Sequence, residues 1–271
     1  MKIDFKEDEK SLTNRIKIHD LYGSANIDDW MLDSIKVKKD ESILDLGCGD
    51  GKQSFAISNY LDKNFQDCNY KIIGMDEHED LIEKANKKNS NQKIKFDVGS
   101  FDKNFPYPKN SFDLIIACFA IYYAENIDQT VNEIKRVLKK NGRIFFTGPM
   151  PNNKFEFNEI IEEASNAKVP KLIGSSRFSS EIFDSVKKNL DSAKIDIFKN
   201  ELKFDKIDPY IEYARSALEK NRKVYEKFLE GKNLDLILTK VSSILQDKIK
   251  KDGKLVMTKM VGGIMAYKIN D

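Results

Sequence analysis

The fold is decided by residues 43–54, which read ILDLGCGDGKQS. A short apolar run leads into three glycines, Gly47, Gly49 and Gly51, and apolar residues at helical spacing follow them. Glycine adopts backbone angles that other residues avoid, and it lets a ligand come close to the main chain. The stretch therefore predicts a strand, a ligand-binding turn and a helix.

Two common ligands fit this turn poorly. A phosphate-binding P-loop needs a glycine where Leu46 stands and a hydroxyl where Gln53 stands. A nicotinamide-dinucleotide fingerprint needs its third glycine at the position of Lys52.

Strands and helices alternate around this turn. The fourth predicted strand, SFDLIIACF, is apolar almost throughout, as a central parallel strand should be. Five strands in about 110 residues predict a doubly wound parallel α/β sheet. The predicted strands cover residues 41–47, 70–76, 93–99, 111–119 and 143–148, and a helix is predicted over 127–140, before the last of them.

The regular alternation of strands and helices ends after Pro151. The patterns predict helices over 155–166 and 179–190, a strand over 194–204, helices over 208–229 and 234–249, and a closing strand over 254–269. The helix pair between the last two strands looks like an insertion. We expect one domain over 1–271, divided into an N-terminal helical cap segment 1–40, a cofactor-binding core 41–150, a helical lid insertion 206–252 and a closing strand 253–271.

Two carboxylates end neighbouring predicted strands. Asp45 closes the first strand and Asp76 the second, and in a doubly wound sheet both ends face one crevice. Asp45 suits a cationic group, and Asp76 can accept hydrogen bonds from both hydroxyls of a ribose. An ammonium, a ribose and a close backbone approach together match S-adenosylmethionine. Taken singly, either residue could equally be a turn or cap residue.

These motifs resemble those of the class I S-adenosylmethionine-dependent methyltransferases. The matching stretches lie between Glu41 and Gly148, and they read LDLGCGDG, IIGMDEHEDLIEKA, VGSFDKNFPYPKNSFDLIIACFAIYY and EIKRVLKKNGRIFFTG. The resemblance implies a Rossmann-like doubly wound sheet of about seven strands, mostly parallel with an antiparallel last strand, plus a helical lid. It also implies S-adenosyl-L-methionine as cofactor and S-adenosyl-L-homocysteine as product.

The resemblance carries over a set of cofactor residues. Ser100 stands where many members have an aspartate that reads adenine, and Asp102 competes with it. Glu77 either packs its stem on adenine or is a solvated acid at a helix start, and Gln53 is as compatible with a plain surface position. The predicted cofactor contacts are Tyr22, Asp45, Gly47, Cys48, Gly49, Gln53, Asp76, Glu77, Ser100, Phe101 and Cys118.

The acceptor side is less defined. Tyr122 and Tyr123 follow the fourth strand and should face the substrate, and His19 or Tyr122 could act as a general base. The aromatic residues of the insertion fit either an acceptor site or the buried face of a helix. They are Tyr210, Tyr213, Tyr225 and Phe228.

The acceptor class is narrowed by two missing motifs. Asn/Asp-Pro-Pro-Tyr after the fourth strand and a Pro-Cys nucleophile are both absent, which argues against amide, adenine-N6 and base-C5 acceptors. We expect methyl transfer to a small or medium-sized metabolite by direct in-line substitution. The alternatives are an RNA or protein methyltransferase and a non-catalytic cofactor-binding or regulatory subunit.

The composition and net charge limit the kinds of partner that we expect. A net charge of +2 argues against nucleic acid, and three cysteines without a CxxC pair, with only two histidines, argue against disulfides and a metal site. The longest apolar run, residues 114–124, is too short for a membrane span, and the first ten residues do not resemble a signal peptide. We expect a cytoplasmic protein with a small-molecule substrate; the sequence carries no signal for its oligomeric state.

Overall fold

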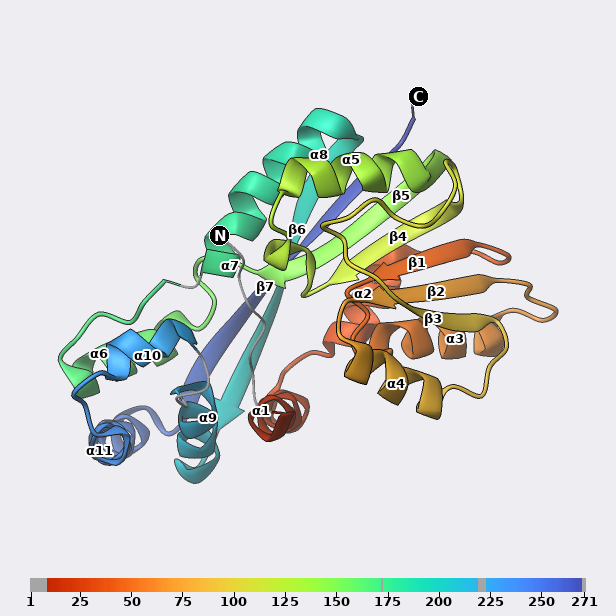
Figure 1. The fold of residues 1–271 in the computed structure, drawn as a ribbon. Helices are drawn as coiled ribbons and strands as arrows, with labels where there is room; N and C mark the ends of the chain where they lie inside the picture. The colour runs from red at the N-terminus through yellow and green to blue at the C-terminus, as the bar shows by residue number, and fades with distance from the viewer. Residues whose placement is uncertain (1–8, 172, 219–222, 270–271) are drawn as a thin grey trace.

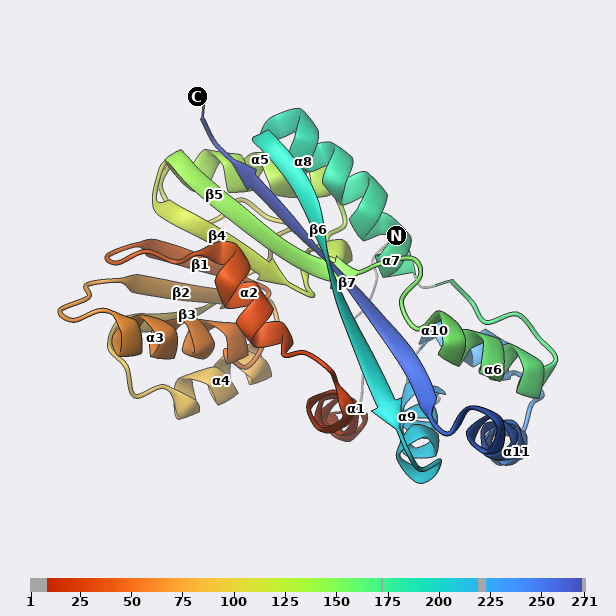
Figure 2. The same ribbon diagram turned by 180° about the vertical axis from the view of Figure 1, so that it is seen from behind.

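The computed structural model describes residues 9–171, 173–218 and 223–269. A seven-stranded sheet runs through it in the order β3-β2-β1-β4-β5-β7-β6 (Figures 1 and 2). Neighbours among β1 to β5 are parallel, whereas β7 lies antiparallel between β5 and β6. The predicted mixed sheet is therefore confirmed. The strands are β1 Ser42–Leu46, β2 Lys71–Asp76, β3 Ile94–Val98, β4 Phe112–Cys118, β5 Leu138–Pro149, β6 Asp191–Phe204 and β7 Leu255–Tyr267.

Helices cover both faces of the sheet (Figure 1). On one face lie α2 (Ile27–Ile35), α3 (Lys52–Asn64) and α4 (Glu79–Lys88); on the other lie α5 (Ile127–Val137) and α8 (Phe183–Asn189). Successive strand residues point to opposite faces, so Ile43 packs with the α2–α4 side and Leu44 with the α5–α8 side. The nearly continuous apolar strands of the sequence follow from this double burial.

Helix α5 ends earlier than the sequence pattern suggests. The pattern extends the helix to Lys140, but Leu138 is already extended and pairs with Phe112 of β4. Ser111 also donates its backbone N–H to the carbonyl of Val137 at 2.7 Å. Strand pairing therefore overrides helix propensity at this junction.

The helical segment predicted over 179–190 instead begins earlier than the sequence pattern suggests. It is preceded by α7 (Ile173–Arg177) and a π-helical turn, η2 (Phe178–Ile182), before α8. The predicted helix over 208–229 is found as α9 (Asp208–Leu218) and α10 (Lys223–Leu229), and its residues 219–222 lie outside the described part of the chain.

A second group of helices surrounds the outer ends of β6 and β7 (Figures 1 and 2). These two strands are 14 and 13 residues long, so they extend past the shorter parallel strands. We call this group the helical cluster. It consists of α1 (Glu9–Tyr22), α6 (Phe155–Ser165), α9, α10 and α11 (Leu234–Asp252). Its core is apolar and rich in buried aromatic rings, with Phe157, Phe204 and Tyr213 among them.

None of the described helices is both long enough and apolar enough to cross a membrane.

Candidate cofactor and active site

The glycine loop after β1 is built from left-handed residues. Gly47, Gly49 and Gly51 have φ of +68°, +55° and +88°. The backbone N–H groups of Gly47 and Cys48 donate to the carbonyl of Met75 at 2.7 and 3.2 Å, so the loop is pinned to the end of β2. A Cβ on Gly47 would lie 2.3 Å from the Cβ of Ala120, whereas a Cβ on Gly49 would meet nothing within 4 Å. Gly47 thus serves packing, and Gly49 leaves open space beside the main chain.

Asp76 holds this open loop from the neighbouring strand. Its Oδ2 accepts the backbone N–H of Gly49 at 2.9 Å, and its Oδ1 accepts the backbone N–H of His78 at 2.9 Å. The side chain is buried, with a residue exposure of 8%. The two features that the sequence places in one crevice, the glycine loop and the second strand end, are therefore in direct contact.

Asp45 lies beneath the loop. It is 1% exposed, and its Oδ2 accepts a hydrogen bond from the hydroxyl of Ser54 at 2.7 Å. Burial raises the pKa of Asp45 to about 7, the Ser54 hydrogen bond opposes the rise and the charge of Asp76 adds to it. A cation bound nearby would favour the ionised form. Burial likewise raises the pKa of Cys48, which keeps this residue a thiol.

Ser100 and Glu77 face each other across the ends of β3 and β2. The Ser100 hydroxyl donates to Glu77 Oε2 at 3.4 Å. The carboxylate of Asp102 instead accepts the backbone N–H of Glu125 at 2.7 Å, on the loop before α5. This arrangement favours Ser100 over Asp102 as the polar group at the adenine position. The ring of Phe101 lies 3.5 Å from the Cβ position of Gly47, beside the loop.

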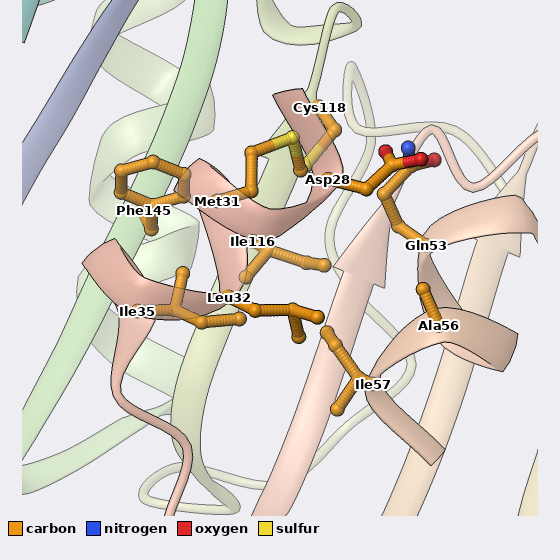
Figure 3. A pocket seen from close by; sticks show the side chains of 10 residues that line it. All are labelled: Asp28, Met31, Leu32, Ile35, Gln53, Ala56, Ile57, Ile116, Cys118 and Phe145. Carbon is orange, nitrogen blue, oxygen red and sulfur yellow. The ribbon is translucent and has the colours of Figure 1, made fainter. Parts of the chain in front are cut away.

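A narrow crevice opens between α2 and α3 (Figure 3). Gln53 and Cys118, both predicted from the sequence, line it together with Asp28 of α2. Its cavity volume is only about 10 Å³, about what one water molecule needs. Asp28 and Lys52 form a salt bridge of 2.9 Å between the two helices. Burial raises the pKa of the Cys118 thiol.

Sequence reasoning missed Asp28, although a signal for its helix was present. The Oδ1 atom of Asn26 accepts the backbone N–H groups of Asp28 and Asp29 at 2.8 and 3.3 Å, which begins α2. An Asn followed by acidic residues and an apolar run is a helix-start pattern. Nothing in that pattern shows that the helix forms a wall of the crevice.

Phe119 was also missed. It follows β4 directly, is 37% exposed and has φ of +56°, which is unusual for a bulky residue. Its backbone N–H donates to the carbonyl of Thr147 at 3.0 Å, so the strained turn is held from β5. The sequence ACFAIYY reads as a continuation of an apolar strand and gives no sign of this turn.

Tyr122 and Tyr123 lie in a short 3-10 turn, η1 (Ile121–Tyr123). Arg177 of α7 donates to the carbonyls of Tyr122 and Ala124 at 2.9 and 2.7 Å. The Tyr122 ring is buried and lies 3.0 Å from the Cβ position of Gly174, while Tyr123 is half-buried. Of the two, Tyr123 is the better placed to meet a ligand.

Tyr22 and His19 belong to the helical cluster. The Tyr22 ring stacks on Phe204 of β6 at a centroid distance of 4.9 Å, and His19 meets Tyr213 of α9 edge to face at 5.8 Å. The structure thus places both against β6 and α9, and their roles toward cofactor or acceptor stay predictions. The insertion aromatics, Tyr210, Tyr213, Tyr225 and Phe228, are buried, which favours the helix-core alternative.

Residues 37–194, more than half of the chain, match the protein-family model described as a methyltransferase domain. The chain belongs to the class I S-adenosylmethionine-dependent methyltransferase family. S-adenosylmethionine is the cofactor of this methyltransferase family, and three features of the site fit it. They are the open backbone at Gly49, the carboxylate of Asp76 that accepts from it, and the buried Asp45 at the end of β1.

Relatives of this methyltransferase include three curated proteins. An uncharacterized methyltransferase, YcgJ of Bacillus subtilis, is 24% identical over 55% of this chain and 56% of its own length. A sterol 24-C-methyltransferase of Pneumocystis carinii is 32% identical over 45% and 32% of the two chains. A demethylmenaquinone methyltransferase of Lactobacillus johnsonii is 30% identical over 41% and 44%. The matches thus span about half or less of these relatives.

The crystal structure of the YcgJ protein shares the fold of this methyltransferase. Its TM-score is 0.56 at 16% identity, with 90% of this chain and 98% of the other covered.

Proposed function

We propose that this protein transfers a methyl group from S-adenosylmethionine to a small or medium-sized metabolite. The observation that carries the proposal is the contact between Asp76 and Gly49 at 2.9 Å, beside a glycine whose Cβ position is open. A loop of this kind lets a nucleoside approach the main chain, with a carboxylate ready for its hydroxyls.

The chain's residues divide between the parts of the cofactor. Asp76 accepts hydrogen bonds from the ribose hydroxyls, and the ionised form of Asp45 stabilises the ammonium. Ser100, Phe101 and Glu77 surround the adenine. Gln53, Asp28 and Cys118 line the crevice for the methionine end.

S-adenosylmethionine supplies a sulfonium-bound methyl group, so the leaving group is already good when the cofactor is bound. The protein's main task is to align the acceptor with the methyl group and to keep water out. Phe119, exposed at the end of β4, offers an apolar contact to the acceptor. Tyr123 adds a second contact from the same side, and Tyr122 and His19 stay the candidate bases.

A small-molecule acceptor is supported by the relatives. Two of them are named for a sterol and for demethylmenaquinone, and both names describe small molecules. We extend only the size class to this chain. The proposal includes a cytoplasmic location, consistent with three cysteines that are free in the structure.

Calorimetric titration with S-adenosylhomocysteine tests the cofactor part. We expect wild type to bind and Asp76→Ala to bind about 100-fold more weakly, since two charge-assisted hydrogen bonds are lost. Asp97→Ala is the control, because Asp97 sits at the end of the next strand and accepts from the Tyr107 hydroxyl at 3.3 Å instead. A wild-type protein that does not bind would contradict the proposal.

The acceptor part needs transfer of a labelled methyl group. Fractions of small molecules, total RNA and total protein are each offered to the enzyme with labelled S-adenosylmethionine. We expect label in the small-molecule fraction. Label confined to RNA or protein would overturn the substrate class while leaving the reaction type intact.

A further inference from the structure

The edge strand β6 carries one polar residue in an otherwise apolar row. From Phe198 to Phe204 the sequence FKNELKF alternates between buried and more exposed positions, and the buried side reads Phe198, Asn200, Leu202 and Phe204. Asn200 is 5% exposed. A polar side chain at such a position costs free energy unless it makes hydrogen bonds.

Asn200 makes those bonds to the link between α1 and α2. Its Oδ1 accepts the backbone N–H groups of Ser24 and Ala25 at 2.8 and 3.2 Å, and the Ser24 hydroxyl donates to it at 3.3 Å. Ser24 also donates its backbone N–H to the carbonyl of Glu201 at 3.1 Å. Residues 23–25 are therefore held along the free edge of β6.

The approach requires a glycine at position 23. A Cβ on Gly23 would lie 2.5 Å from the carbonyl oxygen of His19 and 2.7 Å from Nδ2 of Asn200. Gly23 also forms an antiparallel bridge with Leu202. The link has little freedom to shift along the strand.

Helix α2 begins two residues after Ala25 and contacts both the sheet and the crevice. On one side the ring of Trp30 lies 5.1 Å from that of Phe198 and 5.7 Å from that of Phe145. On the other side Asp28, Met31 and Leu32 line the crevice opposite Gln53, as Figure 3 shows. Helix α2 is therefore both a wall of the crevice and the first element after the link that β6 holds.

We propose that Asn200 is a positioning residue for the cofactor crevice. By holding residues 23–25 on β6, it places α2 so that Asp28 and Met31 lie opposite Gln53. An apolar residue would fill the same space but would leave the backbone N–H of Ala25 unpaired. The link would then be held on β6 only by its contacts with Glu201 and Leu202. The proposal rests on the proposed function for its ligand, but the placement of α2 can be measured without any ligand.

Asn200→Leu tests the proposal, because leucine continues the apolar row. Asn200→Asp keeps an oxygen acceptor in place, and Lys199→Ala changes the neighbouring, exposed position of the same strand. We expect S-adenosylhomocysteine to bind about tenfold more weakly to Asn200→Leu in calorimetry, and close to wild type in both other variants.

Trp30 reports on α2 directly, since it is the only tryptophan of the chain. In the absence of ligand, we expect Asn200→Leu to shift its emission to longer wavelength and to raise its quenching by acrylamide, with an unchanged circular dichroism spectrum. If wild type does not bind S-adenosylhomocysteine, the proposed function fails, and Trp30 fluorescence alone decides the role of Asn200.

Gly23→Ala approaches the same contact from the other side and replaces Asn200→Leu if that variant does not fold. Its added methyl group pushes the link away from Asn200 without changing β6, and we expect the same changes in Trp30 fluorescence and binding. Folded variants with wild-type Trp30 fluorescence and wild-type affinity would overturn the proposal, as would an equal effect of Lys199→Ala.

Discussion

The region around the glycine loop and the helical cluster differ in what they bury. Around the loop, the carboxylates of Asp45 and Asp76 are buried, and the backbone adopts left-handed angles at three glycines and at Phe119. In the helical cluster, buried space is filled mainly by apolar and aromatic side chains such as Phe157 and Tyr213. The two regions therefore differ in what is buried: acidic side chains beneath and beside an open loop in one, and packed aromatic rings in the other.

Strand β6 connects the two regions. Its buried row meets Tyr22 of α1 through Phe204 and Trp30 of α2 through Phe198. The N-terminal segment therefore crosses from the helical cluster to the crevice along one strand. Variants in each region should show how far the two behave separately.

The largest effect is expected in the helical cluster. Phe157 is fully buried, and its ring lies 5.7 Å from that of Tyr213, so Phe157→Ala should lower the free energy of unfolding by about 3–5 kcal/mol. Phe155, on the same helix but exposed, provides the control. Phe155→Ala should change the free energy of unfolding by less than about 0.5 kcal/mol. Urea denaturation measures both. The contrast between the regions would break if folded Phe157→Ala also lost affinity for S-adenosylhomocysteine more than tenfold.

A second effect depends on pH and concerns Asp45, beneath the glycine loop. Since burial raises the pKa of Asp45 to about 7, the folded state retains a proton that the unfolded state loses above pH 4, and stability falls as pH rises from about 4 to 7. Asp45→Asn removes this dependence. Its stability relative to wild type should therefore rise by up to about 4 kcal/mol between pH 4 and pH 8. Urea denaturation at the two pH values measures the difference, and an equal difference at both would contradict the burial of an ionisable Asp45.

Two left-handed glycines allow a matched test. Gly49 in the loop and Gly231 in the turn before α11 have φ of +55° and +68°, and neither Cβ position meets an atom within 4 Å. Replacement of either by alanine should cost about 1–2 kcal/mol of folding free energy. Only Gly49→Ala should also weaken binding of S-adenosylhomocysteine in calorimetry. Equal affinities in the two variants would show that the open space at Gly49 is not used by the cofactor.

The smallest expected change in stability comes from removing the hydroxyl of Tyr210, and Tyr70 provides the comparison. Tyr70, beside α3, bonds through its hydroxyl to Ser58 and Asp62 at 2.6 and 2.8 Å, so Tyr70→Phe should cost about 1–2 kcal/mol. The Tyr210 hydroxyl in the helical cluster is buried without a hydrogen-bond partner among the described residues. Tyr210→Phe should therefore stabilise the fold slightly, by up to about 1 kcal/mol. Thermal unfolding of both variants checks the sign, and a destabilised Tyr210→Phe would contradict the apolar character of the cluster.

The periodic parts of the chain could be predicted from the sequence. Apolar runs bounded by glycine and polar turns indicated β1, β2, β4 and the long β6, because burial on one or both faces dictates those patterns. Element ends were less accurate, as at Leu138, where pairing with Phe112 ends a helix that local propensity would continue. Such an end depends on a partner 26 residues away.

The candidate site divides in the same way. The proximity of Gly49 and Asp76 could be predicted because a glycine turn and a strand end are local signals, and parallel strands bring them to one edge. Asp28 and Phe119 were missed. The first matters only because α2 lies against α3, and the second only because Thr147 holds its backbone in a left-handed turn.

The class of fold and the methyl donor could be predicted because both rest on local patterns: alternating strands and helices, a glycine turn and an acid at each of two strand ends. What surrounds the donor depends instead on contacts between distant parts of the chain. The placement of α2 depends on Asn200, which lies 176 residues from Ser24 in the chain. The aromatic residues of the insertion are buried because five helices pack together around them. Contacts of this kind leave no periodic trace in a sequence, since each depends on a surface that exists only after the sheet has formed.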